Sequence, residues 1–306
     1  MKARLLVGTR GSRLALAQAG LVVDMLRRES PGVEFVVVPM KTSGDAPLPE
    51  GPRAIDGKTA FTGEIDRELA AGRIDLAVHS MKDVPPAADE GLVVGATPAR
   101  GDPRDALVSP SGAFLHQLRR GARVGTSSVR RRSQLLAARG DIEVVELRGN
   151  VDTRLRKIEQ EGLDGGVLAL AGLERLGLGS RAAQVFGVEE MVPAVCQGTL
   201  AVKTRTGDDV LELLGRIDDP DTRSSSECER AFAEELGGDC NVPLGAYASV
   251  DSDRMRAVGL VADPRGTRTA RATVEGGRGD PASLGRELAK KVKDAGGLEI
   301  IGGLGG

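Results

Sequence analysis

The sequence is poor in aromatic residues, cysteine and histidine, and it has no long apolar run. With no Trp, one Tyr and five Phe, it lacks the aromatic platform on which proteins stack single-stranded nucleic acid. The net charge of −2 and the pI of about 5.9 give no general affinity for nucleic acids or anionic membranes. These shortages argue against a nucleic-acid-binding protein.

The few cysteines and histidines match no disulfide or metal-binding pattern. Cys196, Cys228 and Cys240 form no CxxC pair, and His79 and His116 are too few for a His-rich site. No segment approaches membrane-spanning length, and Gly and Arg interrupt the N-terminal apolar run, unlike a signal peptide. We therefore expect a cytoplasmic protein with reduced thiols, no metal, and no membrane or nucleic-acid partner.

The chain instead offers ordinary globular composition and a regular alternation of strand and helix patterns. Apolar residues make up 40% and charged residues 28% of the 306 residues, enough for two or three domains. The alternation predicts parallel sheets built from βαβ units. Strands are predicted at 3–9, 35–40, 74–80, 123–128 and 142–149, and helices at 12–28, 61–72, 130–139 and 150–162.

Two turn-rich segments divide the chain, at 97–104 and at 216–221. After the second, the pattern changes to a helix near 224–236, strands between 246 and 274, and a helix from 281. This order predicts a C-terminal α+β domain.

Three strand-to-helix junctions, at 8–12, 125–132 and 148–154, share one design. Each has Ser or Asn to cap the helix, with Arg beside it. Arg in a first helical turn opposes the helix dipole, so helix stability does not explain it. A basic run taken alone indicates a solvated helix face or a phosphate-binding surface, but three such junctions at carboxyl ends of strands favour a ligand with several carboxylates or phosphates. No GxxxxGK[ST] loop is present.

The segment 75–86, DLAVHSMKDVPP, delivers Ser80, Lys82 and Asp83 at the end of a predicted strand. The ordinary interpretation is a turn in which Asp83 pairs with Lys82 or caps backbone amides. Among anion-binding arginines, however, a carboxylate is able to stabilise a cation and transfer protons. His79 is expected to pack in the core.

Two loops complete the pattern. LGGDCNVPLG, at 236–245, places Cys240 among turn-forming residues rather than in a core. The segment 46–57, rich in Pro and Gly, is predicted to be a lid.

In this order the motifs resemble the porphobilinogen deaminase family, whose members are also called hydroxymethylbilane synthases. The resemblance spans nearly the whole chain, and HSMKDVP, TSSVRR and LRGNVDTRL are its most characteristic segments. The motifs are GTRGSRLALAQA, KTSGD, FTGEID, DLAVHSMKDVPP, RDALVS, VGTSSVRRRSQL, LRGNVDTRL, VLALAGLERLG, PAVCQGTLAV and ERAFAEELGGDCNVPLGAYA.

The resemblance implies an α/β fold with two domains like type II periplasmic binding proteins and a smaller C-terminal α+β domain. Domain 1 would comprise 1–98 and 197–215, domain 2 would comprise 99–196, and domain 3 would comprise 216–306. It also implies a monomer. Domain 3 would hold the loop that attaches the cofactor.

The resemblance implies a transferase that adds four porphobilinogen molecules to a dipyrromethane cofactor, releases ammonia, and hydrolyses off hydroxymethylbilane. Asp83 would be the catalytic carboxylate and Cys240 the thioether anchor of the cofactor. Each pyrrole brings an acetate and a propionate, which suits arginine forks. The residues implied to bind cofactor or substrate are Arg10, Ser12, Lys58, Ser80, Lys82, Thr126, Ser127, Ser128, Arg130, Arg131, Arg148, Gly149, Arg154, Ala169, Arg175 and Gln197.

Three positions depart from the family pattern. Gly63 stands where a lysine is usual, and Cys196 and Asp239 stand where glycines are usual. A carboxylate at Asp239 is expected to disfavour the thiolate of Cys240 and to slow cofactor attachment. The rival hypothesis is a non-catalytic carboxylate-binding protein on the same two-domain scaffold, which leaves Asp83 and the Cys240 loop without a purpose.

Overall fold

The structure is a computed structural model that describes residues 2–42, 62–85, 90–237 and 242–303. The chain forms two compact units, Met1–Arg100 with Thr199–Arg223 (unit 1) and Gly101–Gly198 with Ser224–Gly306 (unit 2). The bounds of the three predicted domains are not tested by this division and stay a prediction. The predicted lid at 46–57, Lys58, Asp239 and Cys240 lie outside the described residues.

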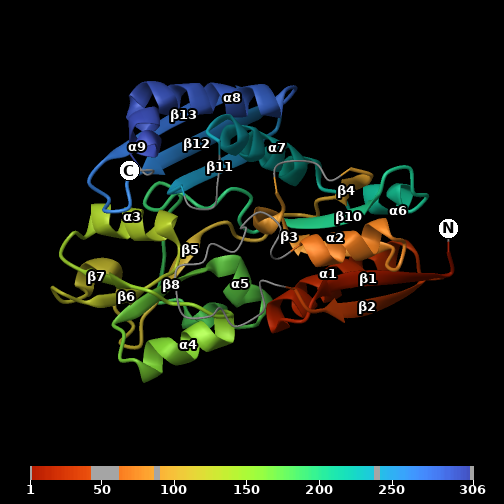
Figure 1. The fold of residues 1–306 in the computed structure, drawn as a ribbon, viewed down its shortest axis with the longest axis horizontal. Coiled ribbons are helices and arrows are strands. Elements are labelled where there is room, and N and C mark those ends of the chain that lie inside the picture. Colours follow the sequence, from red (N-terminus) through yellow and green to blue (C-terminus); the bar gives the residue numbers. More distant parts are fainter. Residues whose placement is uncertain (1, 43–61, 86–89, 238–241, 304–306) are drawn as a thin grey trace. The chain divides into compact units, whose positions relative to one another are not determined.

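Unit 1 contains a five-stranded sheet with the strand order β2-β1-β3-β10-β4 (Figure 1). β1 is parallel to β2 and β3, whereas β10 is antiparallel to its neighbours β3 and β4. The elements of this unit are β1 (Arg4–Arg10), α1 (Arg13–Glu29), β2 (Glu34–Met40), α2 (Gly63–Ala70), β3 (Leu76–Ser80), the 3-10 helix η2 (Met81–Asp83), β4 (Leu92–Ala96), β10 (Leu200–Arg205) and α6 (Leu211–Gly215).

Apolar side chains cover both faces of this sheet. Val78 packs with the buried residues of α1 on one face, and its neighbour Ala77 packs with Ile65 and Leu69 of α2 on the other. Successive strand residues point to opposite faces, so a strand covered on both sides is apolar throughout. This arrangement explains the apolar run of β3, which ends at the polar pair His79 and Ser80.

Unit 2 contains a second five-stranded sheet, with the order β7-β6-β8-β5-β9. Here β6 is parallel to β7 and β8, and β5 is antiparallel to β8 and β9. The elements are β5 (Asp105–Val108), η3 (Leu115–Gln117), β6 (Arg123–Gly125), α3 (Val129–Ala138), β7 (Glu143–Val145), α4 (Val151–Gln160), β8 (Gly165–Ala169), α5 (Leu170–Arg175), η4 (Gly179–Arg181) and β9 (Gln184–Val185).

The C-terminal part of unit 2 is an antiparallel sheet of three strands, β11-β12-β13, with α8 lying along it (Figure 1). Phe232 of α7 is fully buried in its core, and a side chain at Gly259 would lie 2.6 Å from the Phe232 ring. Glycine is therefore needed on β12 for the helix to approach. The elements are α7 (Pro220–Glu235), β11 (Leu244–Asp251), β12 (Arg254–Ala262), β13 (Thr269–Gly277), α8 (Pro281–Val292), the π-helix η5 (Lys293–Gly297) and α9 (Leu298–Gly302).

These sheets confirm the predicted fold class of two α/β regions and a C-terminal α+β region. The prediction of purely parallel sheets is wrong, because β10 and β5 run antiparallel to their neighbours. Neither strand follows a crossover helix from a neighbouring strand, so no βαβ connection sets its direction. Among the described residues, no helix is long and apolar enough to cross a membrane.

Candidate active site

The three predicted junctions form as the sequence indicates. A side-chain oxygen at each one accepts a hydrogen bond from a backbone N–H of the first helical turn, as N-capping requires. The caps are Ser12 on Ala15 (3.2 Å), Ser128 on Arg131 (3.4 Å) and Asn150 on Thr153 (2.9 Å).

The predicted site residues of unit 1 that the structure describes gather in one pocket. Arg10 ends β1, Ser80 ends β3, and Asp83 ends the 3-10 helix η2 that follows. The pocket is lined by Arg10, Ser12, Leu14, Ala15, Gln18, Thr62, Val78, His79, Ser80, Lys82 and Asp83. Strand β3 and its 3-10 turn thus bring a carboxylate to the same pocket as two cationic side chains.

Backbone hydrogen bonds fix the turn that carries Asp83. The N–H of Met81 donates to Thr199 O at 3.0 Å, and the N–H of Val84 donates to Met81 O at 3.1 Å. Gln18 Nε2 donates to Ser80 Oγ at 3.0 Å, which holds that hydroxyl against α1. The backbone that carries Asp83 is therefore fixed. Asp83 itself is half-buried and lines the pocket, so its carboxylate is accessible from there.

Below this pocket, unit 1 buries a polar triad that the sequence did not reveal. Asp66 Oδ1 lies 3.2 Å from His79 Nε2, and its Oδ2 lies 2.9 Å from Lys203 Nζ. Burial alone would raise the pKa of Asp66, but the hydrogen bond and charge of His79 and the charge of Lys203 outweigh it, so this pKa is lowered. His79 is buried in the strand, as predicted.

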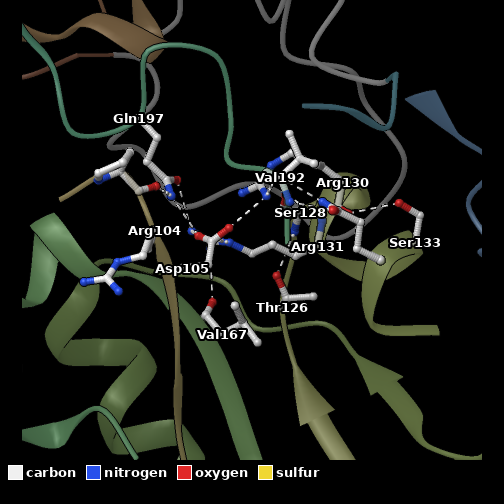
Figure 2. A network of polar contacts seen from close by, with 12 residues as sticks. Arg104, Asp105, Thr126, Ser128, Arg130, Arg131, Ser133, Val167, Val192 and Gln197 are labelled. Carbon is white, nitrogen blue, oxygen red and sulfur yellow. Dashed lines mark hydrogen bonds and ion pairs between the residues drawn. The ribbon is translucent and has the colours of Figure 1, made fainter. Parts of the chain in front are cut away.

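Unit 2 gathers a second group of predicted residues around one carboxylate, Asp105 (Figure 2). Arg131 donates to Asp105 Oδ1 from Nε at 3.0 Å and from Nη2 at 2.7 Å. Arg130 Nη1 lies 2.8 Å from Asp105 Oδ2, and Gln197 Nε2 donates to Asp105 Oδ1 at 2.9 Å. All four side chains are buried.

Asp105 is the functional candidate that sequence reasoning missed. Although its full burial opposes ionisation, the charges of Arg130 and Arg131 hold its pKa well below the usual range. Its sequence signal is its place in RDALVS, as the single acidic residue at the start of an apolar strand. Asp105 also explains why two arginines are tolerated at the start of α3 against the helix dipole.

Arg154, in the first turn of α4, differs from these two arginines. Its buried Nε has no hydrogen-bond partner within the described part of the chain. Burial, together with the positive charge of Arg131, lowers the pKa of Arg154 to about 10. A buried N–H without a partner is costly unless an acceptor completes it, so half-buried Arg154 is well placed to bind an anion.

Some predicted residues stand apart from the Asp105 group. Arg148 is exposed and donates to Glu146 Oε1 at 2.5 Å. Arg175 Nη2 donates to Gly198 O at 2.5 Å, and burial lowers the pKa of this arginine. Gly198 has φ +91, and a side chain there would meet Gly101 O at 2.4 Å, so this contact requires glycine.

The other predicted residues lie at strand ends or helix starts. Thr126 Oγ1 accepts from the N–H of Ser128 at 3.2 Å, and Ser127 is exposed between them. Gly149 has φ +120 beside the cap of α4. Ala169 ends β8 at the start of α5.

Cys196 and Cys228 are both buried and are not joined in a disulfide. Burial raises the pKa of Cys228 to about 12, which is typical of a thiol that packs in a core rather than one that reacts. Cys196 adopts φ +57, the left-handed conformation that glycine favours, at the position where a glycine was expected. Among the described residues, no group of three or more His, Cys, Asp or Glu side chains is placed to hold a metal ion.

Comparison with protein families gives two matches that together span most of the chain. Residues 5–212 match "Porphobilinogen deaminase, dipyromethane cofactor binding domain", and residues 224–294 match "Porphobilinogen deaminase, C-terminal domain". A porphobilinogen deaminase of Pelotomaculum thermopropionicum is 47% identical over 302 residues, covering 98% of this chain and 97% of its own. One from Roseiflexus castenholzii is 44% identical over 304 residues, covering 99% and 100%.

Solved structures with a similar fold include periplasmic binding domains. A Salmonella typhimurium periplasmic binding protein studied for its arginine specificity matches with a TM-score of 0.39 and 14% identity, over 70% of this chain and 91% of its own. The periplasmic VFT2 domain of BvgS from Bordetella pertussis matches with a TM-score of 0.39 and 15% identity, over 70% and 86%. At these scores the likeness adds nothing to the fold seen in the three sheets.

Proposed function

The chain belongs to the porphobilinogen deaminase family, and we propose that Asp83 and the buried arginines of unit 2 are the residues that perform this family's reaction in it. Its activity is that of a hydroxymethylbilane synthase of tetrapyrrole biosynthesis, with porphobilinogen as substrate. The family match decides for the enzyme and against the non-catalytic carboxylate-binding alternative. The observation that supports the assignment of residues is the pocket in which Asp83 lies with Arg10, Ser80 and Lys82.

Asp83 is proposed as the proton-handling carboxylate. When the aminomethyl C–N bond of porphobilinogen breaks, its electron pair leaves with nitrogen, and a proton is required to form ammonia. The pyrrole becomes cationic, and a carboxylate accepting a hydrogen bond from the pyrrole N–H stabilises that charge. After the new carbon–carbon bond forms, the same carboxylate accepts the proton lost from the ring carbon.

Arg10 and Lys82 are proposed to bind the acetate and propionate of the incoming substrate. Both line the pocket of Asp83, and guanidinium and ammonium groups are the usual partners of carboxylates. Ser12 and Ser80 add hydroxyls to the same wall. These contacts orient the pyrrole while Asp83 acts.

The arginines of unit 2 are proposed to bind the carboxylates of the dipyrromethane cofactor and of the growing chain. The residues present fit an anionic group, because Arg154 has a buried Nε with no partner among the described residues, and the guanidinium groups of Arg130 and Arg131 share one carboxylate. The cofactor supplies the primer from which the product chain grows. Further contacts with the cofactor or the growing chain are proposed for Lys58, Thr126, Ser127, Ser128, Arg148, Gly149, Ala169, Arg175 and Gln197.

Cys240 is proposed as the covalent anchor of the cofactor, which rests on the family resemblance of the ERAFAEELGGDCNVPLG segment. The same resemblance supports a monomer and the three-domain division, whereas the few cysteines, which match no disulfide pattern, support a cytoplasmic location. Three positions depart from the family pattern. Gly63 begins α2 and Cys196 is buried, and neither is among the residues proposed to contact the cofactor or substrate. Asp239 beside the anchor is expected to slow cofactor attachment.

Intact-mass analysis of freshly purified, active enzyme tests the cofactor and its anchor. We expect the chain mass plus two linked pyrrole rings, and the unmodified mass for Cys240→Ser. The unmodified mass in active wild-type enzyme would reject the covalent anchor.

The role of Asp83 is tested by Asp83→Ala, with the exposed Asp24→Ala as control. We expect a folded, cofactor-bearing Asp83→Ala protein whose ammonia release is nearly abolished, and normal release for the control. Near-normal ammonia release by Asp83→Ala would remove this residue from the mechanism.

A further inference from the structure

Asp105 is a buried carboxylate that pairs with Arg130 and Arg131 in unit 2, and no step of the proposed reaction uses it. It is fully buried at the start of β5 and contacts Arg131, Arg130 and Gln197 through both of its oxygens. Figure 2 shows these side chains converging on it from different segments. Such a cluster either makes burial of the arginines tolerable or sets where their guanidinium groups lie.

Each arginine is held at two places. Arg131 Nη1 donates to Val167 O at 3.0 Å while its other nitrogens bind Asp105. Arg130 Nη1 donates to Val192 O at 2.7 Å and lies 2.8 Å from Asp105. Two-point attachment removes the rotamer freedom of a long side chain before any ligand arrives. Ligand binding then does not have to pay the entropy of ordering these arginine side chains, which is how preorganised sites gain affinity.

The charges in this cluster do not balance. The guanidinium groups of Arg130 and Arg131 share the carboxylate of Asp105, and no carboxylate of the described residues forms an ion pair with Arg154. Arg154 is close enough for the charge of Arg131 to act on it, and its buried Nε has no partner in the described chain. Uncompensated buried charge requires counter-charge. One internal carboxylate fixes the arginines and leaves positive charge for ligand carboxylates.

We propose that Asp105 is a positioning residue of the anion site, which fixes the guanidinium groups of Arg130 and Arg131 where ligand carboxylates meet them. This inference rests on the proposed function, in which these arginines bind the carboxylates of cofactor and growing chain. Gln197 extends the arrangement, because its amide donates to Asp105 at 2.9 Å and to Pro103 O at 2.7 Å. The position of the carboxylate, and not only its charge, then determines activity.

Two substitutions separate position from charge. Asp105→Glu keeps the charge but moves the carboxylate by one methylene, and Asp105→Asn keeps the size but removes the charge. A displacement of about 1 Å is able to cost about 100-fold in rate. For cofactor-loaded Asp105→Glu we therefore expect kcat/KM for porphobilinogen to fall about 10- to 100-fold, with the melting temperature near that of wild type. Native mass spectrometry should show partly elongated enzyme accumulating.

The matched control is Asp102→Asn, three residues earlier. Asp102 pairs with Arg104 at 2.5 Å and contacts neither Arg130 nor Arg131 in the described structure. We expect kcat/KM of this control within about twofold of wild type, as for a partly exposed pair. Asp105→Asn, assayed below its own melting temperature, should lose at least as much kcat/KM as Asp105→Glu.

The proposal is overturned if Asp105→Glu has wild-type kcat/KM, because charge alone would then suffice. It is also overturned if neither Asp105 variant folds, which would assign Asp105 to stability. Arg154→Gln distinguishes this from failure of the proposed function: if that variant elongates normally, the arginines do not bind ligand carboxylates. If Arg154→Gln is impaired while Asp105→Glu is normal, only the positioning role is wrong.

Discussion

Replacing Asp66 by Asn in α2 should destabilise unit 1 strongly, because Asp66 is the carboxylate that pairs with His79 and Lys203 in the buried triad. Asp66 Oδ2 lies 2.9 Å from Lys203 Nζ, and both side chains are less than a tenth exposed. Removing one partner of a buried ion pair leaves the other charge uncompensated, which costs about 3–5 kcal/mol. Asn keeps the size and a hydrogen-bond acceptor for His79, so we expect the lower end, about 3 kcal/mol.

Helix α2 also offers the matched control. Glu68 lies two residues after Asp66 and pairs with Arg73 at 2.5 Å on the exposed face of the same helix. An exposed pair is screened by water and salt, so Glu68→Gln should leave the urea midpoint unchanged. Unfolding would be followed by far-UV circular dichroism, with hydrogen exchange of β3, α2 and β10 identifying the region affected. Equal losses in the two variants would refute the argument from burial.

The sign of the pH dependence follows from the pKa of Asp66. Because this pKa is lowered in the folded protein, the carboxylate stabilises the fold above its ordinary value of 3.8. That contribution is lost as the pH falls through the lower pKa of the folded protein. The carboxylate's part of the difference between wild type and Asp66→Asn should therefore persist at neutral pH and disappear only in acid below about pH 4.

Three further outcomes are expected. Arg154→Gln should accumulate partly elongated enzyme in native mass spectra, because this half-buried arginine is proposed to bind ligand carboxylates, whereas Arg156→Gln on the exposed face of α4 should not. Phe232→Ala should lower the unfolding free energy of unit 2 by about 3–5 kcal/mol in urea titrations, since the ring is fully buried; a loss below about 1 kcal/mol would contradict that packing. Cys228, with a pKa of about 12, should resist alkylation by iodoacetamide at pH 8 in the folded protein and react in urea.

The parts of the fold that sequence predicted are those set by neighbouring residues. Ser12, Ser128 and Asn150 cap their helices because a short side-chain oxygen reaches an amide three residues ahead. The end of β3 at Ser80 is equally local, since an apolar run gives way to polar residues and a 3-10 turn. The position of Asp83 in a pocket followed from these local features.

The parts that sequence missed depend on residues far apart in the chain. β10 pairs with β3 across more than a hundred residues, and nothing in LAVKTR states its direction. Asp66 and Lys203 look like ordinary surface charges until the sheet brings them to 2.9 Å. Asp105 likewise precedes Arg131 by 26 residues, beyond any helical or hairpin spacing.

Between Arg119 and Lys157 the sequence has eleven Lys or Arg against four Asp or Glu, and the arginines of this segment are compensated in two different ways in the structure. At the start of α3, Arg130 and Arg131 oppose the helix dipole, and Asp105 compensates them from a neighbouring strand. At the start of α4, Arg154 receives no such compensation from the described residues. A count of charges treats these arginines as equivalent, but burial and pairing distinguish them: we propose that Arg130 and Arg131 are fixed by Asp105 and that Arg154 is the arginine left to contact the ligand. We therefore expect Arg154 to form the ion pair with a ligand carboxylate that it lacks among the described residues. Arg130 and Arg131 are expected to contact the ligand in the positions that Asp105 fixes.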